Sequence, residues 1–107
     1  MNPCTLNQLG VTRETPWAVG HFNIHNQEFI RAVVSAAEQE RSPAILAVGM
    51  MSVKYMGLEP LISACQSISQ ETSVPIAVHL DHGDSFELCK SCIDGGFTSV
   101  MIDGSHL

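Results

Sequence analysis

Three side chains in the second half of the sequence have the chemistry of a metal-assisted acid–base site. Asp81 and His82 are neighbours, and Asp103 follows further along the chain. A neutral imidazole can bind Zn²⁺ while an adjacent carboxylate stays free to move a proton. Asp103 could be a second metal ligand, or it could orient the first. The residue types leave these two roles for Asp103 open.

Asp81 and His82 can serve one site only if the backbone around them is irregular. In a regular strand, neighbouring side chains point to opposite faces of the sheet. Both can reach one site if the strand ends near them and the chain turns, and we expect Gly83 to permit that turn. Asp84 is explained by capping of the helix that follows.

Other polar residues near predicted strand ends have weaker claims to function. Asn23 could contact a substrate, or its side chain could form an Asx turn. His79 lies two residues before Asp81, so both side chains should point to the same face of the sheet, and we favour a hydrogen-bonded core histidine at position 79. His25 and His106 are expected on loop surfaces. Of this group, we keep only Asn23 as a candidate substrate-binding residue.

The cysteines offer a second possible site. Cys89 and Cys92 form a C-x-x-C pattern, which suits a redox pair or half of a zinc site. The pattern falls inside a predicted helix, however, and the sequence contains no second C-x-x-C. We therefore expect Cys89 and Cys92, like Cys4 and Cys65, to be ordinary thiols packed in or near the core.

The elements that must position these residues follow from alternating apolar runs and amphipathic stretches. Strands are predicted over residues 18–22, 44–48, 76–80 and 97–102. Helices are predicted over 26–40, from Pro60 to a break at 73–75, and over 84–95, with a loop at 49–57. We expect Asn26 to cap the first helix. The last helix should face the core with Phe86, Cys89, Cys92 and Ile93.

This order of elements predicts an α/β fold with a parallel sheet of about four strands and three helices. An open doubly wound sheet and a (β/α)₈ barrel both fit. The G-x-G-x-x-G fingerprint is absent, so a dinucleotide-binding sheet has no support. In both folds, functional groups gather at the carboxyl ends of the strands. With the last two strands side by side, Asp81, His82 and Asp103 should share one rim.

Composition narrows the classes of function. The 107 residues are 45% hydrophobic and 15% charged, as in ordinary globular domains, and the net charge of −6 disfavours nucleic acid or an anionic membrane as the main partner. No stretch is apolar enough to span a bilayer, and residues 1–10 lack the pattern of a signal peptide. A cytoplasmic location is the expectation.

Several segments, in order, resemble the class II, zinc-dependent ketose-bisphosphate aldolases of the fructose-bisphosphate and tagatose-bisphosphate type. The resemblance runs from about Trp17 to the last residue. It is carried by the segments AVGHFNIHN at 18–26, RSPAIL at 41–46, KYMG at 54–57, HLDHG at 79–83 and GFTSVMIDGSH at 96–106. No single segment is specific, but the set is.

The resemblance implies that residues 1–107 are the N-terminal part of an incomplete (β/α)₈ TIM barrel. Such enzymes act in glycolysis and carbohydrate metabolism, cleaving fructose 1,6-bisphosphate, tagatose 1,6-bisphosphate or a related ketose phosphate to dihydroxyacetone phosphate and an aldehyde. Zn²⁺ polarises the ketone. By resemblance, Asp81 is the acid/base, His82 is a zinc ligand, Asp103 holds an alternative metal position and Asn23 contacts substrate. A homo-oligomer is implied for the full-length form.

Two features bear on this hypothesis. The alternative aldolase chemistry needs a Schiff-base lysine, and neither Lys54 nor Lys90 lies at a predicted strand end. Gly49 stands where the family usually has a serine that contacts substrate. Two alternatives stay open: the isolated chain is an inactive fragment whose exposed sheet edges promote association, or it belongs to a different barrel that performs metal-assisted hydrolysis.

Overall fold

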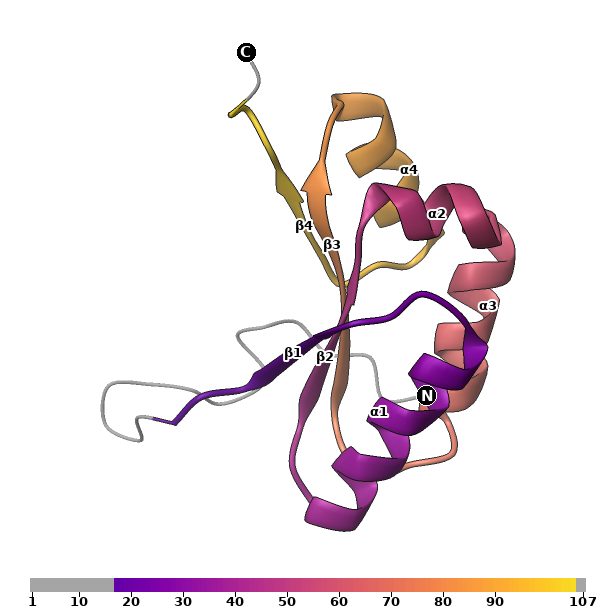
Figure 1. The fold of residues 1–107 in the computed structure, drawn as a ribbon, viewed down its shortest axis with the longest axis vertical. Coiled ribbons are helices and arrows are strands. Elements are labelled where there is room, and N and C mark those ends of the chain that lie inside the picture. The colour runs from indigo at the N-terminus through magenta and orange to yellow at the C-terminus, as the bar shows by residue number, and fades with distance from the viewer. Residues whose placement is uncertain (1–16, 106–107) are drawn as a thin grey trace.

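The computed structural model describes residues 17–105, which form a four-stranded parallel sheet with the strand order β1-β2-β3-β4. The elements in chain order are β1 (Gly20–Asn23), α1 (Gln27–Glu40), β2 (Ala44–Val48), α2 (Met50–Met56), α3 (Leu58–Ser69), β3 (Ile76–Gly83), α4 (Phe86–Gly95) and β4 (Ser99–Ile102) (Figure 1). The α/β class and the parallel sheet are confirmed. None of the helices described is long and apolar enough to cross a membrane.

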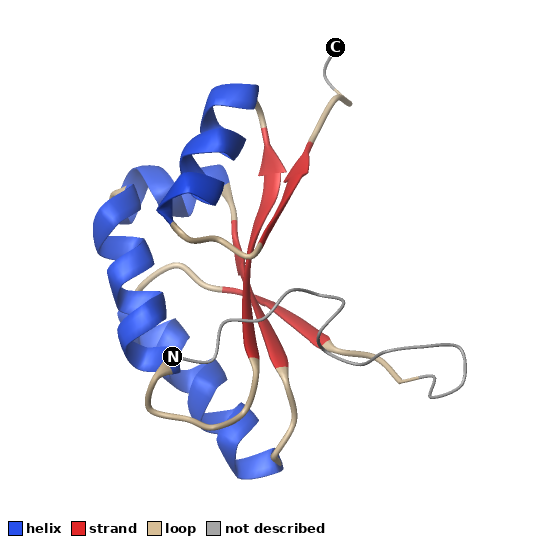
Figure 2. Ribbon diagram, turned by 180° about the vertical axis from the view of Figure 1, so that it is seen from behind, coloured by secondary structure: helices blue, strands red, loops and turns tan. Residues whose placement is uncertain are grey.

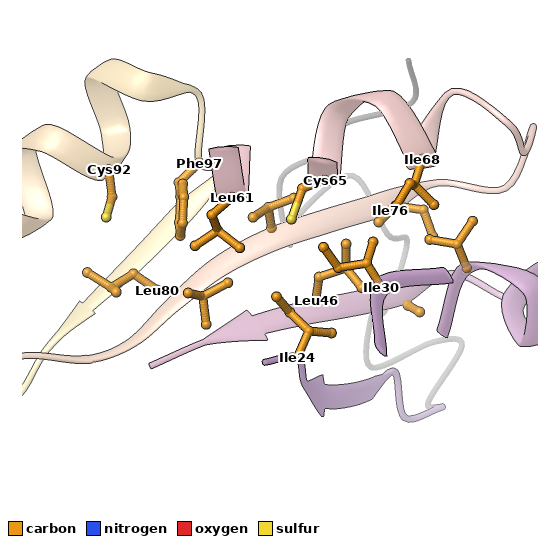
Figure 3. Packing of buried hydrophobic residues seen from close by; sticks show 14 of the residues in the cluster. Ile24, Ile30, Leu46, Leu61, Cys65, Ile68, Ile76, Leu80, Cys92 and Phe97 are labelled. Atoms are coloured by element: carbon orange, nitrogen blue, oxygen red, sulfur yellow. The ribbon is translucent and has the colours of Figure 1, made fainter. Parts of the chain in front are cut away.

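All four described helices lie on one face of the sheet, as Figures 1 and 2 show from opposite sides. That face carries the main core. Leu46 of β2 and Ile76 and Leu80 of β3 are completely buried and belong to one cluster with Ile30 of α1 and Leu61 of α3 (Figure 3). Each such side chain contributes roughly 1.5–3 kcal/mol through burial.

The opposite face of the sheet has a much smaller apolar cluster. It consists of Ile45 and Ala77, with the partly buried Val19 against them. Alternate residues of a strand point to opposite faces, so β3 sends its even-numbered residues 76–80 to the helices and its odd-numbered ones to this second face. The second face therefore has room for polar side chains.

The first helix begins and ends as its sequence predicts. The Asn26 side chain accepts a hydrogen bond of 2.9 Å from the Phe29 N–H, which satisfies a backbone donor of the first turn. Arg41 then adopts a left-handed conformation with φ of 51°, and its N–H donates to carbonyls of the last turn. The predicted cap is confirmed.

The predicted loop over residues 49–57 is wrong, because this segment contains helix α2. Backbone bonds from the Val53 N–H to the Gly49 carbonyl, at 3.2 Å, and from the Gly57 N–H to the Val53 carbonyl, at 2.8 Å, close its turns. Ser52 is buried and donates to the Ile24 carbonyl at 3.0 Å, tying α2 to the segment after β1. Seven residues between two glycines are too short to show helical periodicity in sequence.

Two expectations for the last helix are also corrected. Ser85, not Asp84, is the N-cap of α4, and its hydroxyl accepts a 3.1 Å hydrogen bond from the Leu88 N–H. Cys89 and Cys92 do face the core, but Phe86 and Ile93 are 69% and 53% exposed. Among the described elements, α4 packs mainly against β4, β3 and α3, and this contact surface covers Cys89 and Cys92 but leaves Phe86 and Ile93 largely exposed.

Candidate active site

An irregularity at the end of β3 brings Asp81 and His82 together. Leu80 pairs with Val100 and Gly83 pairs with Ile102, so β3 has one more residue than β4 between these pairs. This is a β-bulge, and His82 within it has a φ of 56°, in the left-handed region. The Nε2 atom of His82 consequently lies 3.6 Å from the Oδ2 atom of Asp81.

The structure corrects the role expected of Gly83. The left-handed residue that turns the chain is His82, and Gly83 is not in that region. Gly83 is needed for space instead: a Cβ atom there would lie 2.8 Å from the Cys89 sulfur and 3.1 Å from the Met101 carbonyl oxygen. The predicted irregularity is thus present, but glycine serves close packing of α4 and β4 against the bulge.

Asp103 holds the imidazole of His82 in place. Its Oδ2 atom lies 2.9 Å from the His82 Nδ1 atom, and its own N–H donates to the Gly83 carbonyl at 2.8 Å. The Ser105 N–H donates to the other carboxylate oxygen of Asp103 at 2.9 Å. With Nδ1 engaged, Nε2 is the nitrogen left for a ligand, and the His82 side chain is 65% exposed.

These contacts shift the ionisation of both partners. The hydrogen bond to Asp103, followed by the negative charge of Asp81, raises the pKa of His82 above its ordinary value of 6.5. Hydrogen bonds from Ser105 and His82 lower the pKa of Asp103. The His82 imidazole therefore holds its proton more firmly than a free imidazole does, and a cation that binds Nε2 competes with that proton.

A second histidine group lies on the same face of the sheet. The Nδ1 atom of His79 is 2.6 Å from the Ser99 hydroxyl, and burial, followed by the charge of His21, lowers the pKa of His79. The hydrogen-bonded histidine is confirmed, although it is half-buried and not in the main core. Its ring meets the His21 ring edge-on at 5.8 Å between centroids.

His21 is the residue that the sequence reasoning left without a role. His21, His79 and Asp81 each offer a ligand atom, and these atoms lie within 4.8 Å of one another. The sequence pattern that could have identified His21 is the alternation of side chains along a strand. His21 and Asn23 share one face of β1, as His79 and Asp81 share one face of β3. What the sequence could not show is that β1 and β3 bring these faces together across β2.

The remaining candidate residues are Asn23, His25 and His106. Asn23 is exposed and is the last residue of β1, so it lies at the rim formed by the strand ends. His25 is on the surface as expected, yet its Nδ1 atom lies 3.0 Å from the Ser52 hydroxyl. His106 lies outside the described residues.

The described cysteines pack as expected. Cys65, Cys89 and Cys92 are buried and free. Burial raises the pKa of Cys65 to about 12, and burial together with Cys89 raises that of Cys92 to about 11. The thiols of Cys65 and Cys92 therefore stay protonated at neutral pH, which makes them poor metal ligands and nucleophiles. Cys4 lies outside the described residues.

The donor set at the rim fits part of a zinc site. His82 presents an available Nε2 atom, and Asp103 supports its other nitrogen as carboxylates do behind metal-bound histidines. Asp81, beside it, is a carboxylate that can carry a proton. Catalytic zinc sites use three protein ligands, so residues beyond His82 must complete this one.

Comparisons with known proteins identify the family of the chain. A family model described as fructose-bisphosphate aldolase class-II matches residues 5–107. The fructose-bisphosphate aldolase of Geobacillus stearothermophilus is 50% identical over 93 residues, covering 84% of this chain and 32% of that protein. The fructose-bisphosphate aldolase of Staphylococcus aureus (strain Mu50 / ATCC 700699) is 44% identical over 97 residues, covering 88% of this chain and 34% of that protein.

A solved structure gives the same answer for the fold. The crystal structure of the YdjI aldolase from Escherichia coli K12 matches with a TM-score of 0.78 and 34% sequence identity, covering 85% of this chain and 35% of that chain. The chain spans about a third of the length of the curated relatives it matches. The strand–helix units described above therefore correspond to part of an aldolase TIM barrel, which confirms the predicted fold class.

Proposed function

The chain belongs to the class II fructose-bisphosphate aldolase family, and from this premise we propose that it supplies the first strand–helix units of a zinc-dependent aldolase. The reaction is cleavage of a ketose bisphosphate, such as fructose 1,6-bisphosphate or tagatose 1,6-bisphosphate, to dihydroxyacetone phosphate and an aldehyde phosphate. The observation that carries the proposal is the bulge that sets Asp81 beside His82, with Asp103 bonded to the same imidazole.

Asp81 is the proposed proton carrier. Its carboxylate accepts the proton of the substrate C4 hydroxyl while the bond between C3 and C4 breaks, so that C4 leaves as the aldehyde and the electron pair of the bond stays on the three-carbon fragment. Protonation of that fragment at C3 completes dihydroxyacetone phosphate. Zn²⁺, when bound, supplies Lewis acidity at the ketone oxygen.

The neighbouring residues hold the reactants. His82 is the proposed zinc ligand through Nε2, and the hydrogen bond from Nδ1 to Asp103 fixes its ring. Asp103 is also proposed to hold the alternative metal position of the family. Asn23, on the same rim, is the proposed substrate contact.

Exposed apolar residues on the outermost elements support the proposal that residues 1–107 form part of a barrel domain. Phe22 of β1 and Ile102 of β4, on the two edge strands, are 50% and 61% exposed. An apolar groove between β1 and α1 is lined by Trp17, Phe22, Val33 and Pro43, among others. The neighbouring units of a closed barrel would cover such surfaces. Among residues 17–105, the proposed catalytic zinc site has one imidazole ligand, His82, so we expect the isolated chain to release no triose phosphate.

The test is a chimaera in which residues 17–105 replace the matching segment of the Geobacillus stearothermophilus aldolase. A coupled assay measures triose phosphate release from both ketose bisphosphates, with and without a chelator. Asp81→Asn should lower turnover by a factor of roughly 100 or more while zinc stays bound, since general acid–base groups contribute about 10²–10⁴-fold. His82→Ala should lose the zinc held at the His82 position and turnover together.

Asp84→Asn is the matched control, because Asp84 is exposed and does not cap α4. This variant should keep both zinc and rate. The assignment of roles is wrong if Asp81→Asn and His82→Ala retain zinc and full turnover. Products that lack dihydroxyacetone phosphate would favour metal-assisted hydrolysis instead.

A further inference from the structure

His21 of β1 and His79 of β3 approach each other on the face of the sheet opposite the helices. We call this second face the open face. Their rings are 5.8 Å apart between centroids, although β2 lies between the two strands. Neighbouring strands are about 4.8 Å apart, so these backbones are separated by roughly 10 Å. The two side chains must therefore lean toward one another above β2.

The residues of β2 explain how the rings can meet. Ala47 pairs with His79, and Ile45 pairs with His21. Ala47 is completely buried, and its methyl group leaves the space directly above β2 open to the two imidazoles. Asp81, two residues after His79, faces the same space because strand parity repeats every second residue.

We propose that His21, His79 and Asp81 form a second binding site for a first-row divalent transition cation such as Zn²⁺, distinct from the His82 position. The three ligand atoms lie within 4.8 Å of one another. In a tetrahedral site with bonds of 2.0–2.1 Å, ligand atoms are about 3.3 Å apart. No separation has to shorten by more than roughly 1.5 Å, which rotation of the terminal torsions of histidine and aspartate can provide.

The donor set selects the class of cation. Two imidazoles and one carboxylate suit Zn²⁺, Co²⁺ and related ions, whereas Mg²⁺ and Ca²⁺ prefer oxygen ligands throughout. The Nδ1 atom of His79 is engaged with the Ser99 hydroxyl at 2.6 Å, which orients the ring and leaves Nε2 for the cation. Solvent supplies the fourth ligand, because His21 is exposed.

The site shares Asp81 with the proposed reaction but does not depend on that reaction being correct. Asp81 also lies 3.6 Å from the His82 Nε2 atom, so the carboxylate stands between the two positions. A cation held by His21, His79 and Asp81 would engage the proposed proton carrier and compete with its catalytic role. The two proposals therefore make separate predictions for His21, which has no part in the cleavage reaction.

The test is titration of the full 107-residue chain with Co²⁺, followed by visible absorption, and with Zn²⁺, followed by histidine resonances in NMR spectra. We expect one Co²⁺ whose binding is at least tenfold weaker in His21→Ala. Ser99→Ala should weaken the same binding to a smaller extent by freeing the His79 ring. Zn²⁺ should shift the His21 and His79 resonances together.

Two further histidine variants identify the site. His25→Ala is the matched control, because His25 is also exposed and lies just after the same strand, and its affinity should stay within twofold of the parent. His82→Ala should keep the binding that depends on His21. Far-UV circular dichroism checks that each variant folds, and His21→Gln, which keeps a polar side chain, repeats the test if His21→Ala does not.

Unchanged Co²⁺ affinity in His21→Ala, or no binding by the parent chain below about 1 mM Co²⁺, overturns this second site. Binding that depends on His82 and not on His21 does the same while leaving the proposed aldolase function intact. Conversely, an inactive chimaera with intact His21-dependent binding would count against the aldolase proposal alone.

Discussion

The two faces of the sheet differ sharply, although the same strands build both. The face under the helices is a continuous apolar core that includes Leu46, Ile76 and Leu80. The open face carries only a small apolar cluster and, beside it, His21, His79 and Asp81. Alternate residues of one strand thus build the apolar core and the group of possible ligands. The bulge at the end of β3 interrupts this alternation and lets His82 join Asp81.

The largest expected effect is on the helix-covered face. Leu46→Ala removes a completely buried side chain from the centre of the cluster and should lower the free energy of unfolding by roughly 2–5 kcal/mol. Urea denaturation of the full chain, followed by circular dichroism, measures this. Asn23→Ala, on the exposed rim, should change the same quantity by less than about 0.5 kcal/mol. Equal losses in both variants would remove the distinction between the faces.

A substitution at the bulge should have the next largest effect. In Gly83→Ala, the added methyl group would meet the Cys89 sulfur and the Met101 carbonyl, so overpacking should cost roughly 1–3 kcal/mol in urea denaturation. Adding Cys89→Ala should recover only part of this loss, because Leu80 Cδ2 at 2.9 Å and the Met101 carbonyl oxygen at 3.1 Å still crowd the new Cβ atom. No loss in Gly83→Ala would show that close packing does not hold the bulge.

The pair of His82 and Asp103 at the rim should make a smaller, pH-dependent contribution to the free energy of unfolding. The pKa of His82 is raised in the folded state. The contribution of His82 to stability is therefore complete below pH 6.5 and is lost as the pH rises through the raised pKa. The pKa of Asp103 is lowered in the folded state. The contribution of Asp103 to stability is therefore complete above pH 3.8 and is lost as the pH falls through the lowered pKa. The pair should therefore contribute most between pH 3.8 and 6.5.

Proton NMR titration of the metal-free chain measures the His82 pKa directly. Asp103→Asn should return it toward 6.5, because the largest cause of the shift is the hydrogen bond to the Asp103 carboxylate. Zn²⁺ affinity at His82 should fall as pH decreases through the raised pKa, since the proton competes for the ring. A His82 pKa that Asp103→Asn does not lower would contradict the observed pairing.

The smallest expected effect is a gain at the start of α2. Gly49 is the N-cap of this helix without a side-chain hydrogen bond, and a Cβ atom there would meet nothing within 4 Å. Gly49→Ser should stabilise the chain by a few tenths of a kcal/mol by capping a free N–H. Urea denaturation tests this, and a loss of stability would show that the segment after β2 does not start as a capped helix.

The parts of the fold that were predictable from the sequence are those set by local patterns. The strand at 44–48 and the Asn26 cap were predicted as found, because a continuous apolar run and a side chain that can cap each act within a few residues. The choice between Ser85 and Asp84 as the cap of α4 was not, since adjacent residues of both types can cap and only the exact chain path decides.

The meeting of Asp81, His82 and Asp103 was predictable, but the backbone geometry that brings them together was not. Asp81, His82 and Asp103 do meet at one rim, as expected from parallel strands. The left-handed conformation of His82 was missed because it depends on the extra residue of β3 opposite β4, a tertiary feature. His21 was missed for the same reason, because its approach to His79 depends on the small Ala47 between them.

The division of roles along β3 is tested most directly by the adjacent residues Leu80 and Asp81. Leu80 is completely buried under the helices, and Asp81 faces the open side. We predict that Leu80→Ala lowers the free energy of unfolding in urea by roughly 2–5 kcal/mol, whereas Asp81→Ala changes it by less than about 1 kcal/mol. A loss in Asp81→Ala as large as that in Leu80→Ala would mean that Asp81 holds the fold together, and would contradict the account.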